Sequence, residues 1–162
     1  MADSNFECLG LDSIDVANAI RYIAQTENIS VNMTQINKLL YIAYGTMLVS
    51  QKKRLTTEHP SAWPYGPVFP RVHRNVKLSD SITSDAYDKL REQDISITNL
   101  LQSVVSTFGR LSATKLSAWS HQLGSPWDIA VKESNGMWNT KLNDEAIYNY
   151  FYSFLNMSAK NE

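Results

Sequence analysis

The sequence predicts a mainly α fold, a compact single helical domain with one proline-rich structured loop that has room for a short β-hairpin. Apolar residues recur at helical spacing along most of the 162-residue chain, and four of its five prolines fall within residues 60–70. A chain of this length with 43% hydrophobic and 19% charged residues is most simply one globular domain. We therefore expect an N-terminal extension at 1–12, a helical domain at 13–157 and a C-terminal tail at 158–162.

Two helices are expected before the proline-rich loop. Ser13 can cap the first, with Asp15 in its first turn, and Thr34 can cap the second. The apolar stripe of the first helix consists of Val16, Ala17, Ile20, Ile23 and Ala24. The stripe of the second consists of Ile36, Leu39, Leu40, Ala43 and Met47. Both stripes have helical spacing, so we expect both to face the core.

Residues 60–70 are expected to form an ordered but irregular loop. Each proline fixes its own φ, removes a backbone donor and biases the residue before it toward extended backbone. Strand-like stretches at 55–57 and 62–65 are therefore expected only as a short, edge-type pair. Three aromatic residues stand between the prolines: Trp63, Tyr65 and Phe69. The loop either clamps these rings onto its own core or presents them to a partner.

The rest of the chain is expected to be helical. Pro70 can begin a short helix, and one modest helix fits within the polar residues 79–94. The most regular apolar face spans residues 97–108 and ends before Gly109. The last helix follows Asn143, and its apolar face consists of Ile147, Tyr150, Phe151, Phe154 and Leu155.

Two short helices are expected between these. Ser112 can cap the first of them, and Gly124 can end it. Ser125 and Pro126 then have the residue types of an N-cap and a first helical position. Asp128 lies three residues after Ser125, so its carboxylate can accept a hydrogen bond from the backbone of Ser125 and form a reciprocal capping box with it.

The N-terminus and the cysteine content predict a cytoplasmic protein. The first twelve residues carry three acids and no basic residue, unlike a secretory signal. No apolar run approaches the roughly 20 residues that span a membrane. The single cysteine, Cys8, cannot form an internal disulfide and fits a reducing compartment. We expect it to lie in a frayed segment that holds a nucleophile poorly.

The residues that catalysis needs do not converge in this sequence. None of the three histidines, His59, His73 and His121, has a partner at metal-ligand spacing, and the six glycines form no phosphate-binding loop. His121 and Asp128 could make a base and its orienting carboxylate, as in a hydrolase, but a histidine near a helix end more often caps or packs. We predict no catalytic residue, no cofactor and no metal.

Nucleic-acid binding is the alternative from a different class. Residues 112–133 have the lengths of a helix-turn-helix, but the second helix reads PWDIAVKE, which is apolar and slightly acidic, whereas a helix that reads DNA offers basic and amide groups. Residues 51–78 carry six Lys/Arg and one acid in a chain of net charge −1. Their aromatic residues could stack on single strands, although the same residue types serve protein interfaces. An acidic partner and a solvated basic face both stay open.

Three blocks of the sequence carry a resemblance to a known family. They are INKLLYIAYG at 36–45, AWPYGPVFP at 62–70, and a block at 111–130 that contains Leu111-Ser112, Leu116, His121, Ser125-Pro126-Trp127 and Ala130. Together and in this order, over about residues 14–132, they resemble the Panacea domain of SocA-like antitoxins and phage-associated GepA-type proteins. Thr46 and residues 59–61 depart from the family pattern, which leaves the class of partner open.

The resemblance implies an antitoxin, often encoded beside a small toxin in bacteria or prophages. Such a protein neutralises its cognate toxin protein by direct contact, and some members hand the toxin to a protease as an adaptor. No enzymatic activity is implied. The alternative reading is a nucleic-acid-binding regulator of its own operon. The identity of the toxin and the oligomeric state stay open.

We predict two sets of site residues. The candidates for toxin contact are Trp63, Tyr65, Phe69, Arg71, Arg74, Lys38 and Tyr41. The residues predicted to hold the motif together are Gly66, Pro67, His121, Ser125, Pro126 and Trp127. Whether the aromatic residues of the loop bind a partner or clamp the loop to the core stays open, because tryptophan serves both purposes.

Overall fold

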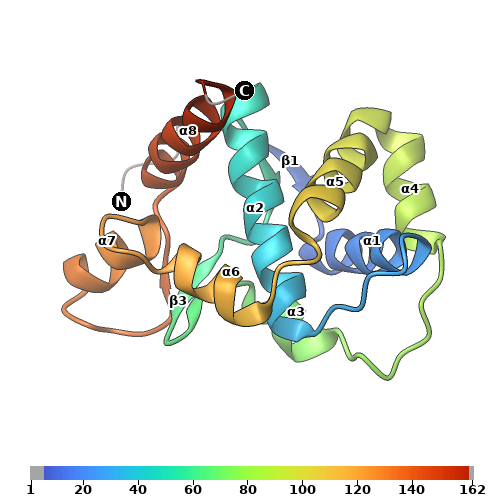
Figure 1. Ribbon diagram of the computed structural model, residues 1–162, viewed down its shortest axis with the longest axis horizontal. Helices are drawn as coiled ribbons and strands as arrows, with labels where there is room; N and C mark the ends of the chain where they lie inside the picture. The colour runs from blue at the N-terminus through green and yellow to red at the C-terminus, as the bar shows by residue number, and fades with distance from the viewer. Residues whose placement is uncertain (1–5, 161–162) are drawn as a thin grey trace.

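The computed structural model describes residues 6–160, where the chain forms eight helices and five short strands (Figure 1). The helices are α1 (Ser13–Thr26), α2 (Met33–Gln51), α3 (Pro70–Asn75), α4 (Asp85–Gln93), α5 (Ile95–Phe108), α6 (Ala113–Ser120), α7 (Pro126–Glu133) and α8 (Asp144–Lys160). The strands are β1 (Glu7–Leu11), β2 (Lys53–Thr56), β3 (Ser61–Trp63), β4 (Gly66–Val68) and β5 (Thr140–Lys141). The prediction of a mainly helical fold is confirmed.

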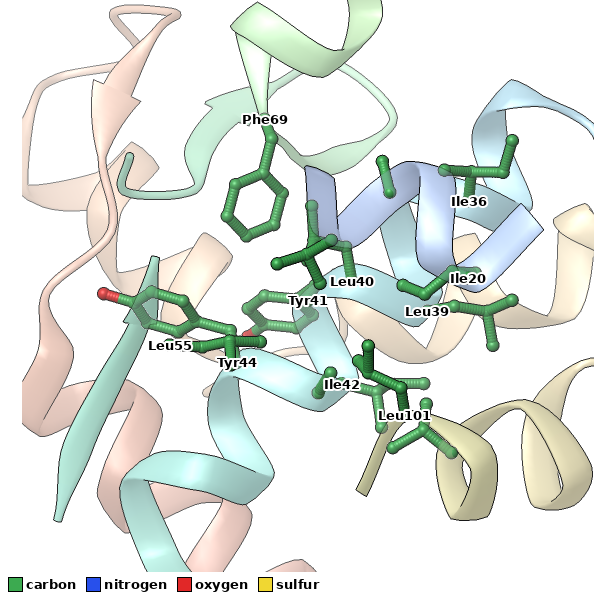
Figure 2. Close-up of a cluster of buried hydrophobic side chains, with 14 of the residues drawn as sticks. Ile20, Ile36, Leu39, Leu40, Tyr41, Ile42, Tyr44, Leu55, Phe69 and Leu101 are labelled. Atoms are coloured by element: carbon green, nitrogen blue, oxygen red, sulfur yellow. The ribbon is translucent and has the colours of Figure 1, made fainter. Parts of the chain in front are cut away.

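Helix α2 runs through the middle of the molecule, with α7 and α8 on one side and α1, α4 and α5 on the other (Figure 1). It packs against α1, α5, α6 and α8 and also contacts β2 and β4. Figure 2 shows Leu39, Leu40 and Tyr41 of α2 beside Ile20 of α1 and Leu101 of α5. Buried residues lie all round α2, as expected of a helix enclosed by its neighbours. The core is therefore built on α2.

The strands form two small sheets. β1 and β2 pair in parallel, and β3 lies between β4 and β5 in an antiparallel sheet. The expected strand-like stretches overlap β2 and β3, but these two strands do not pair with each other. The segment expected to be frayed instead forms β1, in which Cys8 lies opposite Arg54 of β2. Pro67 is tolerated because β4 is an edge strand, where a missing N–H breaks no ladder between neighbours.

Two predicted helix caps are confirmed, and a third cap is found at the start of the last helix. The Ser112 hydroxyl accepts from an amide of the first turn of α6 at 3.1 Å, and the Ser125 hydroxyl does the same for α7 at 3.2 Å. The Asn143 side chain accepts from the Ala146 amide at 3.0 Å, at the start of α8. In each case a short polar side chain satisfies an amide that has no partner within the helix.

Two other predicted caps are wrong. Asp12 rather than Ser13 caps α1, and the Ser13 side chain is buried, with its hydroxyl donating to Glu58. Asn32 rather than Thr34 caps α2, in a reciprocal capping box. Each helix begins beside two residues that are able to cap, and tertiary contacts decide between them.

The connection between α6 and α7 also differs from the prediction. Helix α6 ends at Ser120, and His121 is its C-cap, so the chain turns well before Gly124. The Asp128 carboxylate accepts from the Gly124 amide at 2.8 Å and not from Ser125. The carboxylate therefore fixes the turn that precedes α7 rather than closing a capping box on α7 itself.

Gly45 generates the first testable prediction. It lies where α2 contacts α8, and a Cβ at this position would overlap the ring of Phe151. Gly45→Ala should lower the free energy of unfolding by about 1–3 kcal/mol through overpacking. Helix propensity alone would raise it by about 1 kcal/mol. Urea unfolding of the two proteins measures the difference.

The double variant Gly45→Ala with Phe151→Leu is the control for this prediction. Removing the ring makes room for the new methyl group. The free energy of unfolding that the double variant loses should therefore be smaller than the sum of the losses of the two single variants. A Gly45→Ala variant more stable than the wild type would show that α2 and α8 are not in this close contact.

Candidate functional site

Two polar side chains on α2 hold the hairpin of β3 and β4. The Lys38 ammonium donates to the Pro67 carbonyl at 2.9 Å, and the Asn37 side-chain oxygen accepts from the Phe69 amide at 2.8 Å. Lys38 and Asn37 are each only 1% exposed. Because buried polar groups need partners, these bonds fix where β4 lies on α2.

Gly66 allows the hairpin to come this close. Its φ is +114°, a backbone conformation that residues with a Cβ rarely adopt. A Cβ would lie 2.5 Å from the hydroxyl oxygen of Ser120 on α6 and 3.1 Å from the side chain of Lys38 on α2. Gly66 is therefore needed both for the turn and for the contact of the hairpin with α2 and α6.

A pair of tryptophans joins the hairpin to α7. The Trp127 indole donates to the Trp63 carbonyl at 2.7 Å, and the Trp63 indole donates to the Asn139 side chain at 3.0 Å. The Trp127 ring also stacks on Trp138, with 6.1 Å between centroids, and contacts the ring of His121 at 5.4 Å. These contacts hold the hairpin, the turn before α7 and the loop before β5 together.

The structure buries three of the residues predicted to contact a partner. Lys38 is 1% exposed, and Tyr41 and Phe69 are both 0% exposed. Figure 2 shows the Phe69 ring in the core beside Tyr41 and Tyr44, and its centroid lies 6.0 Å from that of Tyr44. Lys38 and Phe69 are buried because the hairpin folds back onto α2. Tyr41 is covered by Trp119 of α6 and Phe151 of α8. The surface of this structure therefore does not offer these three side chains to a partner.

Exposed aromatic and apolar residues lie on the three segments that the tryptophan pair joins, which are the hairpin, the turn before α7 and the loop before β5. We call this group the aromatic surface, and it consists of Trp63, Tyr65, Leu123, Trp127, Met137 and Trp138. Tyr65 is 78% exposed, Leu123 86%, Met137 68% and Trp138 50%. Singly exposed apolar residues are ordinary, but several of them on three segments that are held together make this surface a candidate interaction site. Sequence reasoning missed Leu123, Met137 and Trp138, although a tryptophan in a polar loop was a usable signal.

A polar groove of about 560 Å³ lies between the start of α1, the link from β2 to β3, α3 and β5. Arg71 and Arg74 both line it, as does Lys141. Two carboxylates, Asp12 and Glu58, line it as well. The groove meets the aromatic surface at Asn139. This residue lines the groove, and its side-chain oxygen accepts a hydrogen bond from the Trp63 indole.

A buried polar cluster fixes the start of α8. The Tyr44 hydroxyl donates to Asp144 at 2.6 Å, and His59 Nε2 lies 3.4 Å from the same carboxylate. Arg54 Nη1 lies 2.7 Å from His59 Nε2. Burial, followed by the Asp144 charge, raises the pKa of Tyr44 well above its ordinary value. The cluster ties α2, β2 and α8 together and presents no nucleophile.

The histidine–aspartate pair considered for catalysis is not assembled. The Asp128 carboxylate binds the Gly124 amide and the Lys132 ammonium, each at 2.8–2.9 Å, and these contacts lower the pKa of Asp128. The His121 ring packs on Trp127 instead. Among residues 6–160, no group of three or more potential ligands could hold a metal ion. In that same range, no helix is long and apolar enough to cross a bilayer.

Comparison with known proteins places these contacts in a family. A family model described as "Antitoxin SocA-like, Panacea domain" matches residues 36–128. Antitoxin SocA of Caulobacter vibrioides (strain NA1000 / CB15N) is 33% identical over 133 residues, which cover 74% of this chain and 70% of that protein. No solved structure matches the chain. The residues that the family model matches include α2 from Ile36 onward, the hairpin and the start of α7.

Lys38 generates a prediction about pH. Burial lowers the pKa of Lys38 to about 8, whereas an unfolded lysine titrates near 10.5. Between these values the unfolded chain binds more protons, so the contribution of Lys38 to stability rises with pH. The free energy of unfolding of the wild type relative to Lys38→Met should increase by about 2 kcal/mol from pH 8 to pH 10. Urea unfolding at pH 8, 9 and 10 measures it.

The exposed Lys77 supplies the matched control, since Lys77→Met removes the same charge from the surface. Its unfolding free energy should keep a constant difference from the wild type over this pH range. Parallel curves for the wild type and Lys38→Met would mean that Lys38 titrates as an ordinary lysine and that its bond to Pro67 is not buried.

Proposed function

This chain belongs to the family of SocA-like antitoxins with a Panacea domain, and from that premise we propose that it neutralises a cognate toxin protein by direct binding, without catalysis. The relative is named an antitoxin, and an antitoxin acts on a toxin. The observation that carries the proposal is the aromatic surface, where exposed apolar side chains lie on a rigid support. We further propose that the protein acts in the cytoplasm and needs no cofactor.

The aromatic surface has the composition and support of a protein-binding site. Tryptophan and tyrosine are enriched among the residues that dominate binding energy. The half-buried Trp63 and Trp127 are held by hydrogen bonds of 3.0 and 2.7 Å. A surface that is ordered before binding pays less entropy when the partner docks. Tyr65 and Trp138 project from this support and are the proposed anchors.

The predicted contact residues divide into two roles under this proposal. Trp63 and Tyr65 remain candidates for toxin contact because they belong to the aromatic surface. Lys38 and Phe69 act indirectly, since they hold the hairpin that carries it. Tyr41 packs in the core against Trp119 and Phe151. Binding of the toxin at the aromatic surface is also compatible with an adaptor role, in which the bound toxin is delivered to a protease.

A DNA-binding role for α7 is less well supported. The Lys132 ammonium, which is the basic group of α7, is paired with Asp128 at 2.9 Å. Trp127, at the start of the helix, is bound to the hairpin. Little remains on α7 to neutralise phosphates, and phosphate contacts supply most of the affinity of such complexes.

The first test of the function is co-expression with the toxic gene that neighbours this one. We expect this protein to restore growth and to co-purify with the toxin, because neutralisation is proposed to occur within a complex. The complex should keep most of its affinity between 50 and 200 mM salt, whereas a phosphate-dominated complex would lose about 10³–10⁵-fold. Restored growth without any complex would contradict direct binding.

A second test identifies the surface. Tyr65→Ala and Trp138→Ala should each weaken toxin binding by about 30-fold, which corresponds to about 2 kcal/mol for an anchor residue. Calorimetric titration with purified toxin measures the loss. The free energy of unfolding should change by no more than about 0.5 kcal/mol for Tyr65→Ala, since that side chain is exposed. Trp138→Ala should lower it by about 0.5–1.5 kcal/mol, because it removes the stack on Trp127.

Tyr152→Ala is the matched control, because Tyr152 is 50% exposed, like Trp138, but lies on α8. It should bind the toxin as the wild type does. If Tyr152→Ala weakens binding and the other two variants do not, the toxin is held by α8 and the aromatic surface is not the site.

A further inference from the structure

The carboxylates that line the polar groove are already occupied by contacts within the chain. Glu58 accepts from the Ser13 hydroxyl with one oxygen and from the Arg71 amide, at 2.8 Å, with the other. Asp12 accepts from the amide of Ile14 at 3.0 Å and from the Arg71 guanidinium at 3.3 Å. Both acids therefore serve to build the groove, and the Arg71 guanidinium offsets the charge of Asp12.

Two cations that line the groove have no such partner. Among the residues that the structure describes, the side chains of Arg74 and Lys141 make no hydrogen bond and no ion pair, and both residues are exposed. Arg74 comes from α3 and Lys141 from β5, so the two positive charges belong to different walls. Arg71 adds a third cation, shared with Asp12. The groove thus offers unpaired positive charge to an incoming anion.

We infer that this groove binds an acidic segment of the toxin, whose Asp or Glu carboxylates pair with Arg74 and Lys141. The inference rests on the proposed function and adds the chemistry of the partner at this place. Carboxylates form charge-assisted hydrogen bonds with guanidinium and ammonium groups. A nucleic acid fits less well, since its continuous row of phosphates would pass the carboxylates of Asp12 and Glu58.

The groove and the aromatic surface can be used by one partner at the same time. Asn139 lines the groove and also binds the Trp63 indole, so no other element separates the two. Exposed charges chiefly set the rate of association, and buried apolar anchors chiefly set the rate of dissociation. The groove therefore steers and orients the toxin, and the aromatic surface retains it.

The test titrates the ¹⁵N-labelled full chain with a capped octapeptide of alternating Glu and Ala, and with its Gln–Ala counterpart. The Glu peptide should shift the amide resonances of groove residues and bind at least ten times more tightly than the Gln peptide. Arg74→Glu with Lys141→Glu should abolish these shifts. Lys77→Glu with Arg91→Glu reverses two exposed charges outside the groove and should preserve them.

Three outcomes of this titration would overturn the inference. The first is that the Gln peptide binds as well as the Glu peptide, or that neither shifts the groove. The second is that the control pair loses binding as completely as the groove pair. The third is that a decamer of thymidylate shifts the groove residues more strongly than the Glu peptide, which would assign the groove to nucleic acid.

The purified toxin separates this inference from the proposed function. Arg74→Glu with Lys141→Glu should slow association at least tenfold at low salt and leave dissociation nearly unchanged, while Tyr65→Ala should do the reverse. A toxin that binds neither the wild type nor any variant would overturn the proposed function, and the peptide titration would still decide the groove. Unchanged association of the groove variant would overturn the inference while the proposed function stands.

Discussion

The hydrogen bond from the buried Lys38 ammonium to the Pro67 carbonyl is the constraint on which the rest of the surface depends. Placing an ammonium in the core is costly, and the cost is offset only if the group keeps good partners. The bond from the Phe69 amide to Asn37 reinforces it on the same helix. Losing either partner would leave a buried polar group unsatisfied, at about 1–3 kcal/mol. The position of the hairpin on α2 is therefore strongly specified.

This constraint explains why large aromatic residues stand between prolines. The prolines limit the conformations of the hairpin, and Phe69 enters the core as a clamp. Gly66 lets the backbone approach α2 and α6, so the turn just before it, with Tyr65, is directed toward solvent. Trp63 is half-buried and bonded at both its indole and its carbonyl. The segment therefore does two things with different residues: Phe69 fixes it to the core, and Tyr65 is exposed to solvent.

The sequence was sufficient for the elements whose determinants are local. The apolar face of 97–108 and the caps at Ser112 and Ser125 depend on neighbours within one or two turns, and they are found as expected. Strand β1 was missed because its partner, β2, lies more than 40 residues away in the chain. Lys38 was missed as a buried residue because a charged side chain beside the apolar stripe normally faces solvent, and here a distant carbonyl reverses that preference.

Under the proposed function, the same division would allow one scaffold to bind different toxins. Substitutions in a close-packed core, or at the buried bonds of Lys38, disturb many contacts at once and cost several kcal/mol. Substitutions at exposed positions such as Tyr65 and Leu123 usually change stability by less than about 0.5 kcal/mol. Binding, in contrast, responds strongly to a few exposed anchors. The partner can therefore change through the aromatic surface and the groove while α2 and the clamped hairpin keep the fold.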